Sequence, residues 1–168
     1  MKNLIALLFI ISMSSCSTYI PFTQEIRNEL ENKKVDITKV QFAIKKKIVL
    51  QRSTSQENQK LNDGTVQTTK ELIREKIVFG VGTPAICKDT KQDKLALYFE
   101  NGDLISKRLI FKLNPDNNYV FYQNSGTVEY DNQNYQVSEG QGTILYVSKK
   151  EITKTKDLSR SVKGLKVN

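Results

Sequence analysis

Residue types that commonly carry out chemistry are scarce in this chain of 168 residues, which has two cysteines and no histidine. The lack of histidine argues against Ser-His-Asp and Cys-His nucleophiles, histidine-ligated metals and imidazole acid–base steps. Paired carboxylates can still cleave a glycan, and four acidic residues adjoin predicted turns: Glu100, Asp103, Glu129 and Glu139. Because no spacing brings any two of them together, we expect solvated charges, no catalytic residues and no enzyme activity.

Motifs that bind phosphates or metals are incomplete. Gly80-Val81-Gly82 lacks the third glycine and the helix of a dinucleotide-binding loop, and no Gly-Lys-Ser/Thr sequence is present. Segments 116–118 and 131–134 are rich in oxygen but do not continue into the glycine and glutamate of a calcium loop. We interpret all three as turns and predict no metal site and no bound cofactor.

The amino terminus has the pattern of an export signal. A basic head, residues 1–3, precedes an apolar run from Leu4 to Met13, half of the ~20 residues that span a bilayer. The run ends in Met13-Ser14-Ser15-Cys16, which resembles the lipobox of bacterial lipoprotein precursors. The resemblance covers residues 1–16 and implies cleavage before Cys16 and a diacylglycerol thioether on its sulfur. An ordinary secretory signal with an incidental cysteine is the alternative.

The resemblance also implies a location. Two or three acyl chains, at ~0.8 kcal/mol per buried methylene, would hold the protein on a membrane. Ser17 is not the aspartate that retains many such lipoproteins at the inner membrane, so the outer membrane is implied. No acidic run follows Cys16, which favours the periplasmic face over the cell surface. Cys87 would then be alone in an oxidising compartment, and its apolar context predicts a buried small side chain.

Residues 16–22 are predicted to be a lipidated tether, and residues 23–148 a single domain. Thr23 is a candidate N-cap, and the spacing of Ile26 and Leu30 predicts an amphipathic helix over residues 23–32. Alternation then predicts one bent strand or two short strands over residues 39–52. Residues 53–64 are polar and end in Asn-Asp-Gly, so they are predicted to be a loop. Residues 65–79 fit a strand better than a helix.

Short strands separated by turns fill the rest of the domain. A turn at residues 80–84 leads to a strand at 85–88, and two hairpins are expected, one joining residues 95–99 to 109–113 and one joining 126–130 to 135–138. Further strands are predicted at 119–122 and 140–148. This spacing predicts a mainly β domain, either a small antiparallel barrel of the SH3-like kind or a sandwich, with one short helix. Six tyrosines fall in or near these strands, where they are ordinary strand residues or, alternatively, a binding platform.

Residues 149–168 form a basic tail, predicted to be an exposed strand or flexible segment. Its basic residues are a candidate surface for an anionic polymer, lipid or protein partner: Lys149, Lys150, Lys154, Lys156, Arg160, Lys163 and Lys166. A solvated tail is the equal alternative. Nucleic acid is an unsuitable partner for an exported protein, despite the formal net charge of +8.

Two functional hypotheses follow from these observations. The first is a non-catalytic accessory or scaffold subunit of an envelope assembly for secretion, transport or outer-membrane biogenesis, with envelope proteins as partners. The second is a lipoprotein that binds alone to a wall polymer, lipopolysaccharide or a foreign enzyme. Small β domains serve both roles, so the fold does not decide between them.

Overall fold

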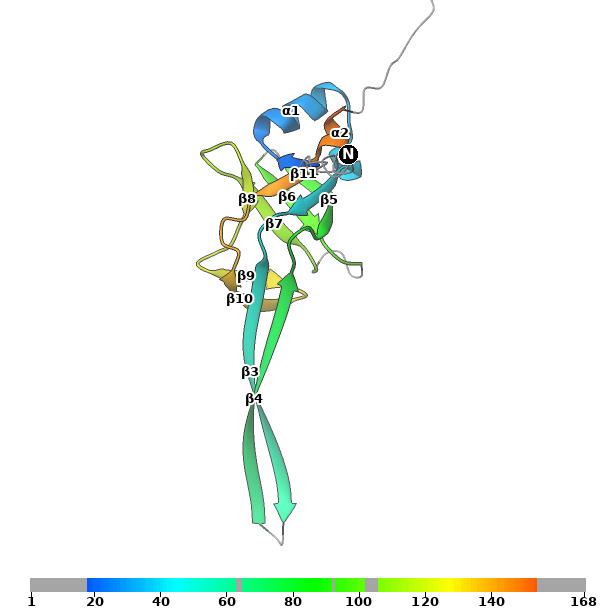
Figure 1. Ribbon diagram of the computed structural model, residues 1–168. Helices are drawn as coiled ribbons and strands as arrows, with labels where there is room; N and C mark the ends of the chain where they lie inside the picture. Colours follow the sequence, from blue (N-terminus) through cyan, green and yellow to red (C-terminus); the bar gives the residue numbers. More distant parts are fainter. Residues whose placement is uncertain (1–17, 63–64, 92, 102–105, 154–168) are drawn as a thin grey trace, which may run out of the picture.

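The computed structural model describes residues 18–62, 65–91, 93–101 and 106–153. The lipobox with Cys16, Asp103, and the tail residues Lys154, Lys156, Arg160, Lys163 and Lys166 lie outside this part of the chain. The mainly β prediction is confirmed: two antiparallel sheets make up most of the structure (Figure 1).

The larger sheet has seven strands and forms most of the body. Their order is β1 (Tyr19–Pro21), β11 (Leu145–Ser148), β2 (Gln41–Ile44), β5 (Pro84–Lys91), β6 (Lys94–Tyr98), β7 (Leu109–Leu113) and β8 (Tyr119–Phe121). The sheet curls until a single bridge joins Val120 to Ile144, just before β11. A closed SH3-like barrel, our first expectation, is therefore wrong, because this bridge does not extend into a continuous ladder and the remaining strands form a separate sheet.

The second sheet has four strands, in the order β4 (Thr65–Phe79), β3 (Ile48–Asn62), β10 (Gln133–Glu139) and β9 (Thr127–Tyr130). The first three residues of β3 are fully buried and pair with the end of β4, so this sheet closes one side of the core. Rings of this sheet pack together there: Phe79 of β4 and Tyr130 of β9 have centroids 5.4 Å apart. Phe99, which directly follows β6 of the larger sheet, lies 5.1 Å from Phe79. The sandwich alternative describes this arrangement better than a barrel.

The predicted helix is confirmed as α1 (Gln24–Asn32), with Thr23 as its N-cap. The Thr23 hydroxyl accepts a hydrogen bond from the Ile26 backbone N–H at 3.3 Å, which satisfies one of the free donors of the first turn. The predicted tether is partly wrong, because residues 19–21 pair with β11 as an edge strand and Phe22 is fully buried. This pairing fixes the chain only three residues after Cys16.

The strand predictions for residues 39–52 and 65–79 are confirmed, and both hairpins form as expected. The predicted loop at residues 53–64 is wrong, because β3 continues to Asn62 and pairs with β4 along its whole length. The tail prediction is also wrong for its first residues, since 149–153 form the short helix α2 (Lys149–Thr153). A 3₁₀ turn, η1 (Ile37–Lys39), completes the described elements.

Candidate binding arm and groove

The most prominent feature of the molecule is an arm made by β3 and β4. Beyond Gln51, which pairs with Gln136 of β10, no other described strand pairs with this hairpin. The free part runs for roughly ten residues per strand, or about 34 Å at the rise of an antiparallel strand. It points away from the end of the body that carries β1, α1 and α2 (Figure 1).

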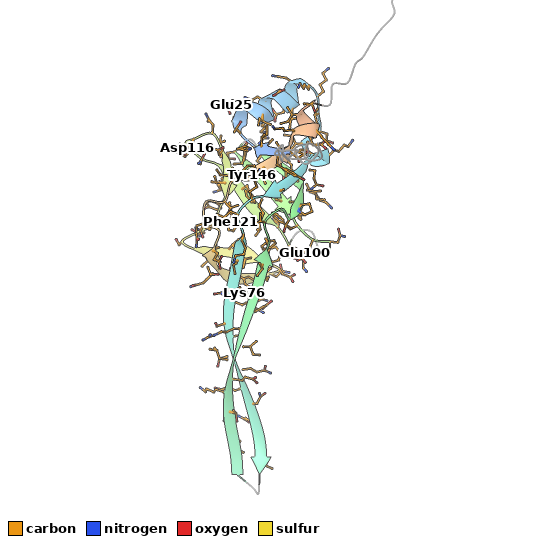
Figure 2. All side chains as sticks on the ribbon, viewed as in Figure 1. Glu25, Lys76, Glu100, Asp116, Phe121 and Tyr146 are labelled. Carbon is orange, nitrogen blue, oxygen red and sulfur yellow. The ribbon has the colours of Figure 1, made fainter. Side chains whose placement is uncertain are left out.

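The arm leaves both of its strand edges open. β4 is the outer strand of its sheet, so no described strand pairs with one of its edges, and no described strand pairs with the outer edge of β3 beyond the body. Side chains stand out from both strands without cover from the described body (Figure 2). A two-stranded ribbon is marginally stable in water, and an open edge is a template for a further strand.

Most of the exposed large apolar side chains of the described chain lie on this hairpin: Leu61, Val66, Leu72, Ile73 and Val78, each at least 45% exposed. Leu61 and Val66 are directly opposite each other near the tip. These aliphatic groups lie on a projecting element whose strand edges are open, so they are accessible to an added strand.

Polar contacts fix the root of the arm to the body. Arg52 of β3 donates to Glu75 of β4 and, at 2.6 Å, to Gln133 of β10. The buried hydroxyl of Tyr135 donates to the other oxygen of Glu75 at 2.9 Å, and the Arg52 guanidinium lies over the Tyr135 ring. The hydrogen bonds from Arg52 and then Tyr135 lower the pKa of Glu75. This cluster therefore sets the direction in which the arm leaves the sheet.

A glycine permits close packing at the same root. Gly140 follows β10 with φ +95°, and a Cβ there would lie 2.6 Å from the carbonyl oxygen of Lys47 and 2.7 Å from the Cα of Ile48, the first residue of β3. Only glycine accommodates both the backbone conformation and this contact.

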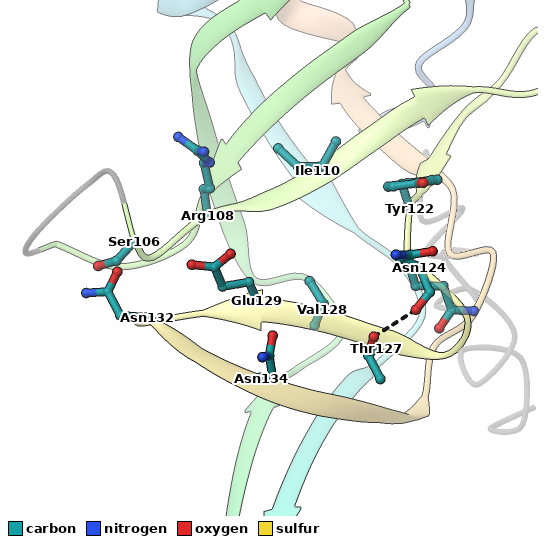
Figure 3. Close-up of a pocket in the computed structure, with 11 residues that line it drawn as sticks. Ser106, Arg108, Ile110, Tyr122, Asn124, Thr127, Val128, Glu129, Asn132 and Asn134 are labelled. Carbon is teal, nitrogen blue, oxygen red and sulfur yellow. Dashed lines mark hydrogen bonds between the residues drawn. The ribbon is translucent and has the colours of Figure 1, made fainter.

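A second candidate site is a groove between β7 and the segment that follows β8 on one side and β9 on the other (Figure 3). Tyr122 and Ile110 line it from above, and Val128 and Glu129 from below. The Gln123 side-chain oxygen in its lining is buried and has no hydrogen-bond partner among the described residues.

The groove continues over β5, β6 and β7, where its lining becomes cationic: Lys91, Lys94, Arg108 and Lys112, against the single carboxylate of Asp89. None of these four cations forms a salt bridge with a described residue. The Lys112 ammonium lies 3.2 Å from the centroid of the Tyr122 ring, a cation–π contact. Such a lining suits an anionic or hydroxyl-rich chain.

The carboxylates considered as catalytic candidates have separate settings. Glu100 accepts a 2.7 Å hydrogen bond from the buried Tyr130 hydroxyl and pairs with Lys107 at 3.3 Å. Glu139 pairs with Lys47 at 2.8 Å, and Glu129 lines the groove. The hydrogen bonds from Tyr130 to Glu100 and from Lys47 to Glu139 lower both carboxyl pKa values. Glu100 and Glu139 are therefore held in structural ion pairs, and Glu129 is a surface charge of the groove.

The other predicted residues are distributed over the body. Cys87 is fully buried, as expected, and burial raises its thiol pKa to about 11. Lys149 and Lys150 are exposed on α2. Four strand tyrosines are buried, Tyr98, Tyr119, Tyr130 and Tyr135, which favours the ordinary interpretation over a platform. Sequence reasoning missed the arm, because the charges along residues 70–76 are visible in the sequence but do not by themselves identify a projecting hairpin.

Within the described ranges, no cluster of His, Cys, Asp and Glu has the arrangement of a metal site. No helix in the same ranges is both long and apolar enough to cross a membrane. Comparison of the chain with protein-family models, with curated proteins and with solved structures finds no match.

Proposed function

We propose that this protein is a non-catalytic, lipid-anchored accessory subunit of a bacterial envelope assembly, and that the β3–β4 arm is the element that docks a partner protein. The single observation that carries the proposal is the arm itself, which projects two open strand edges and a group of exposed aliphatic side chains. Addition of a partner strand to such an edge is a common mode of recognition, in which backbone hydrogen bonds provide affinity.

The position of the arm relative to the proposed anchor supports this role. Cys16 precedes β1 by three residues, and β1 lies at the end of the body opposite the arm (Figure 1). A lipid on Cys16 would hold that end at the outer membrane, so the arm would reach away from the bilayer. On the periplasmic face, which we favour, the partner would be an envelope protein; a cell-surface position is the alternative.

The test is co-purification with a shortened arm. Residues 54–73 are replaced by a two-residue Asn-Gly turn, which suits a tight hairpin and keeps the paired residues Ser53 and Arg74 and the root cluster at Arg52, Glu75 and Tyr135. The full-length protein and this variant are extracted from their own membranes in mild detergent, and the co-purifying proteins are identified by mass spectrometry.

We expect stoichiometric envelope proteins with the intact chain and their loss with the shortened arm, at unchanged membrane association. Circular dichroism provides the control that the body still folds. An intact chain that purifies alone, or partners that remain with the shortened arm, would contradict the proposal.

The cationic groove favours a second candidate function, a lipoprotein that binds an anionic wall polymer or lipopolysaccharide. Lys94, Arg108 and Lys112 would contact anionic groups, with Tyr122 beside them. The test is saturable binding to purified lipopolysaccharide or peptidoglycan. Binding that is lost when these three charges are reversed, but kept when the arm is shortened, supports this candidate in place of the first.

A further inference from the structure

The outer strand of the arm separates its charges by sign onto two faces. In an extended strand, residues two apart share a face. Even-numbered positions of β4 carry the cations Lys70, Arg74 and Lys76, whereas the odd-numbered positions carry the anions Glu71 and Glu75. Leu72 and Ile73, at the centre of this segment, place one exposed aliphatic side chain on each face.

Some of these charges are balanced within the hairpin. Lys70 pairs with Glu57 across the strands at 2.9 Å, and Glu75 pairs with Arg52. Cross-strand pairs of opposite charge stabilise a sheet, so these two residues have their counter-charge on β3.

Three further charges have no counter-charge opposite them on β3. Glu71, Arg74 and Lys76 are exposed, form no salt bridge with a described residue, and lie opposite the neutral side chains of Gln56, Ser53 and Gln51. Lys76 is near enough to Glu139 to lower the pKa of that carboxyl, but no residue of β3 places a counter-charge directly opposite any of the three. A counter-charge directly beside β4 would therefore come from a strand at its open edge. A strand added to the open edge of β4 would place its side chains directly opposite Glu71, Arg74 and Lys76.

From this geometry we infer that the arm binds an extended protein segment with the order acidic, any residue, acidic, apolar, apolar, basic, which adds antiparallel to the open edge of β4. In this register the two acidic residues lie opposite Lys76 and Arg74, the apolar pair opposite Ile73 and Leu72, and the basic residue opposite Glu71. The inference rests on the proposed function and specifies the chemistry of the partner.

An extended segment suits the arm better than a flat anionic membrane does. The two strands of the arm twist about each other (Figure 1), as two-stranded ribbons do strongly. The face that carries Arg74 and Lys76 therefore rotates along the arm. An added strand follows that rotation through its own twist, whereas a planar surface contacts only a short stretch.

The test uses the full-length protein in detergent and two fluorescent peptides, read by anisotropy. The first has the sequence Thr-Glu-Thr-Glu-Val-Ile-Lys-Thr, and the second has each charge reversed. The protein variant Glu71→Lys/Arg74→Glu/Lys76→Glu reverses the same three charges. The control variant Lys45→Glu/Lys46→Glu changes two cations of the body, and vesicles of anionic phospholipid test the membrane alternative.

We expect the native chain to bind the first peptide at least about tenfold more tightly than the second, and the triple variant to show the opposite preference. The control variant should behave as the native chain does. Equal binding of both peptides, no binding of either peptide, or charge-dependent binding to the vesicles alone would overturn the inference. If neither peptide binds, the charges only protect an open edge from aggregation.

The two proposals fail in different ways. If the shortened arm loses its co-purifying proteins but neither peptide binds, the docking function stands and the strand chemistry is wrong. If the partners remain with the shortened arm, the docking function is wrong whatever the peptides do.

Discussion

Substitution of Gly140 by alanine should destabilise the protein far more than the same substitution two residues later. Gly140 and Gly142 both have positive φ, +95° and +65°, so alanine meets an unfavourable backbone conformation at each position. That conformation costs a residue with a Cβ about 1 to 2 kcal/mol. The two sites differ in what the new methyl group contacts.

At Gly142 nothing lies within 4 Å of the added carbon, so Gly142→Ala should cost about 1 kcal/mol. At Gly140 the carbon would lie 2.6 Å from the Lys47 carbonyl oxygen and 2.7 Å from the Ile48 Cα. Both are backbone atoms at the start of β3, so the root of the arm must move. Overpacking of this kind adds about 1 to 3 kcal/mol, and Gly140→Ala should therefore cost about 4 kcal/mol.

Urea unfolding measures the difference. The chain has seven tyrosines and no tryptophan, so far-ultraviolet circular dichroism is the clearer signal. A difference of about 3 kcal/mol corresponds to a shift in Tm of roughly 10 °C for a domain of this size. Equal loss of stability in the two variants would refute the close contact between Gly140 and the root of the arm.

Further outcomes follow from other contacts. Arg27→Met should cost about 2 kcal/mol in urea unfolding, because Arg27 is 6% exposed and its loss removes the 2.7 Å hydrogen bond to the Lys91 carbonyl oxygen; no change would show that this bond is not formed. Glu75, Glu100 and Glu139 have pKa values lowered in the folded state, so stability should be constant above pH ~5 and fall as these carboxyls are protonated at lower pH; a urea midpoint independent of pH down to 3 would contradict this. Cys87, with its pKa raised to about 11, should react with iodoacetamide at pH 8 only after unfolding. Cys16→Ala should release the protein from membranes, and unchanged membrane association would refute the lipid anchor.

Local signals in the sequence were sufficient for much of the body. The cap residue Thr23 and the spacing of Ile26 and Leu30 identify α1, because helix ends and amphipathic faces are encoded locally. Turn residues identify the second hairpin, where Asp131 and Asn132 both adopt positive φ as a tight turn requires. Such features depend on neighbours in the chain and are readable without the fold.

The arm was not readable in the same way. Hydrophobic alternation reveals a strand only when one face is buried, and the side chains of residues 53–59 and of Leu61 are all exposed. These residues are a strand because β4 pairs with them, a contact that depends on the partner strand and not on composition. The separation of charges along residues 70–76 is visible in the sequence, but it has a structural meaning only after β4 is known to be an outer strand.

The buried Arg27 was missed for a related reason. Its position in the helical pattern predicts a solvent-exposed charge. The guanidinium instead donates to the Lys91 carbonyl and the Tyr119 hydroxyl, 64 and 92 residues away in sequence. Only the fold brings these groups together, so no local pattern predicts this burial.

Hydrogen exchange tests the central claim, that the arm docks a protein, most directly. Exchange of the β4 amides is measured by mass spectrometry in isolated native membranes and in the purified, dilute protein, with α1 as the internal reference. We predict that peptides covering residues 65–79 exchange more slowly in the membranes, because an added strand protects the N–H groups of the open edge. Identical exchange of β4 in both preparations would contradict the account.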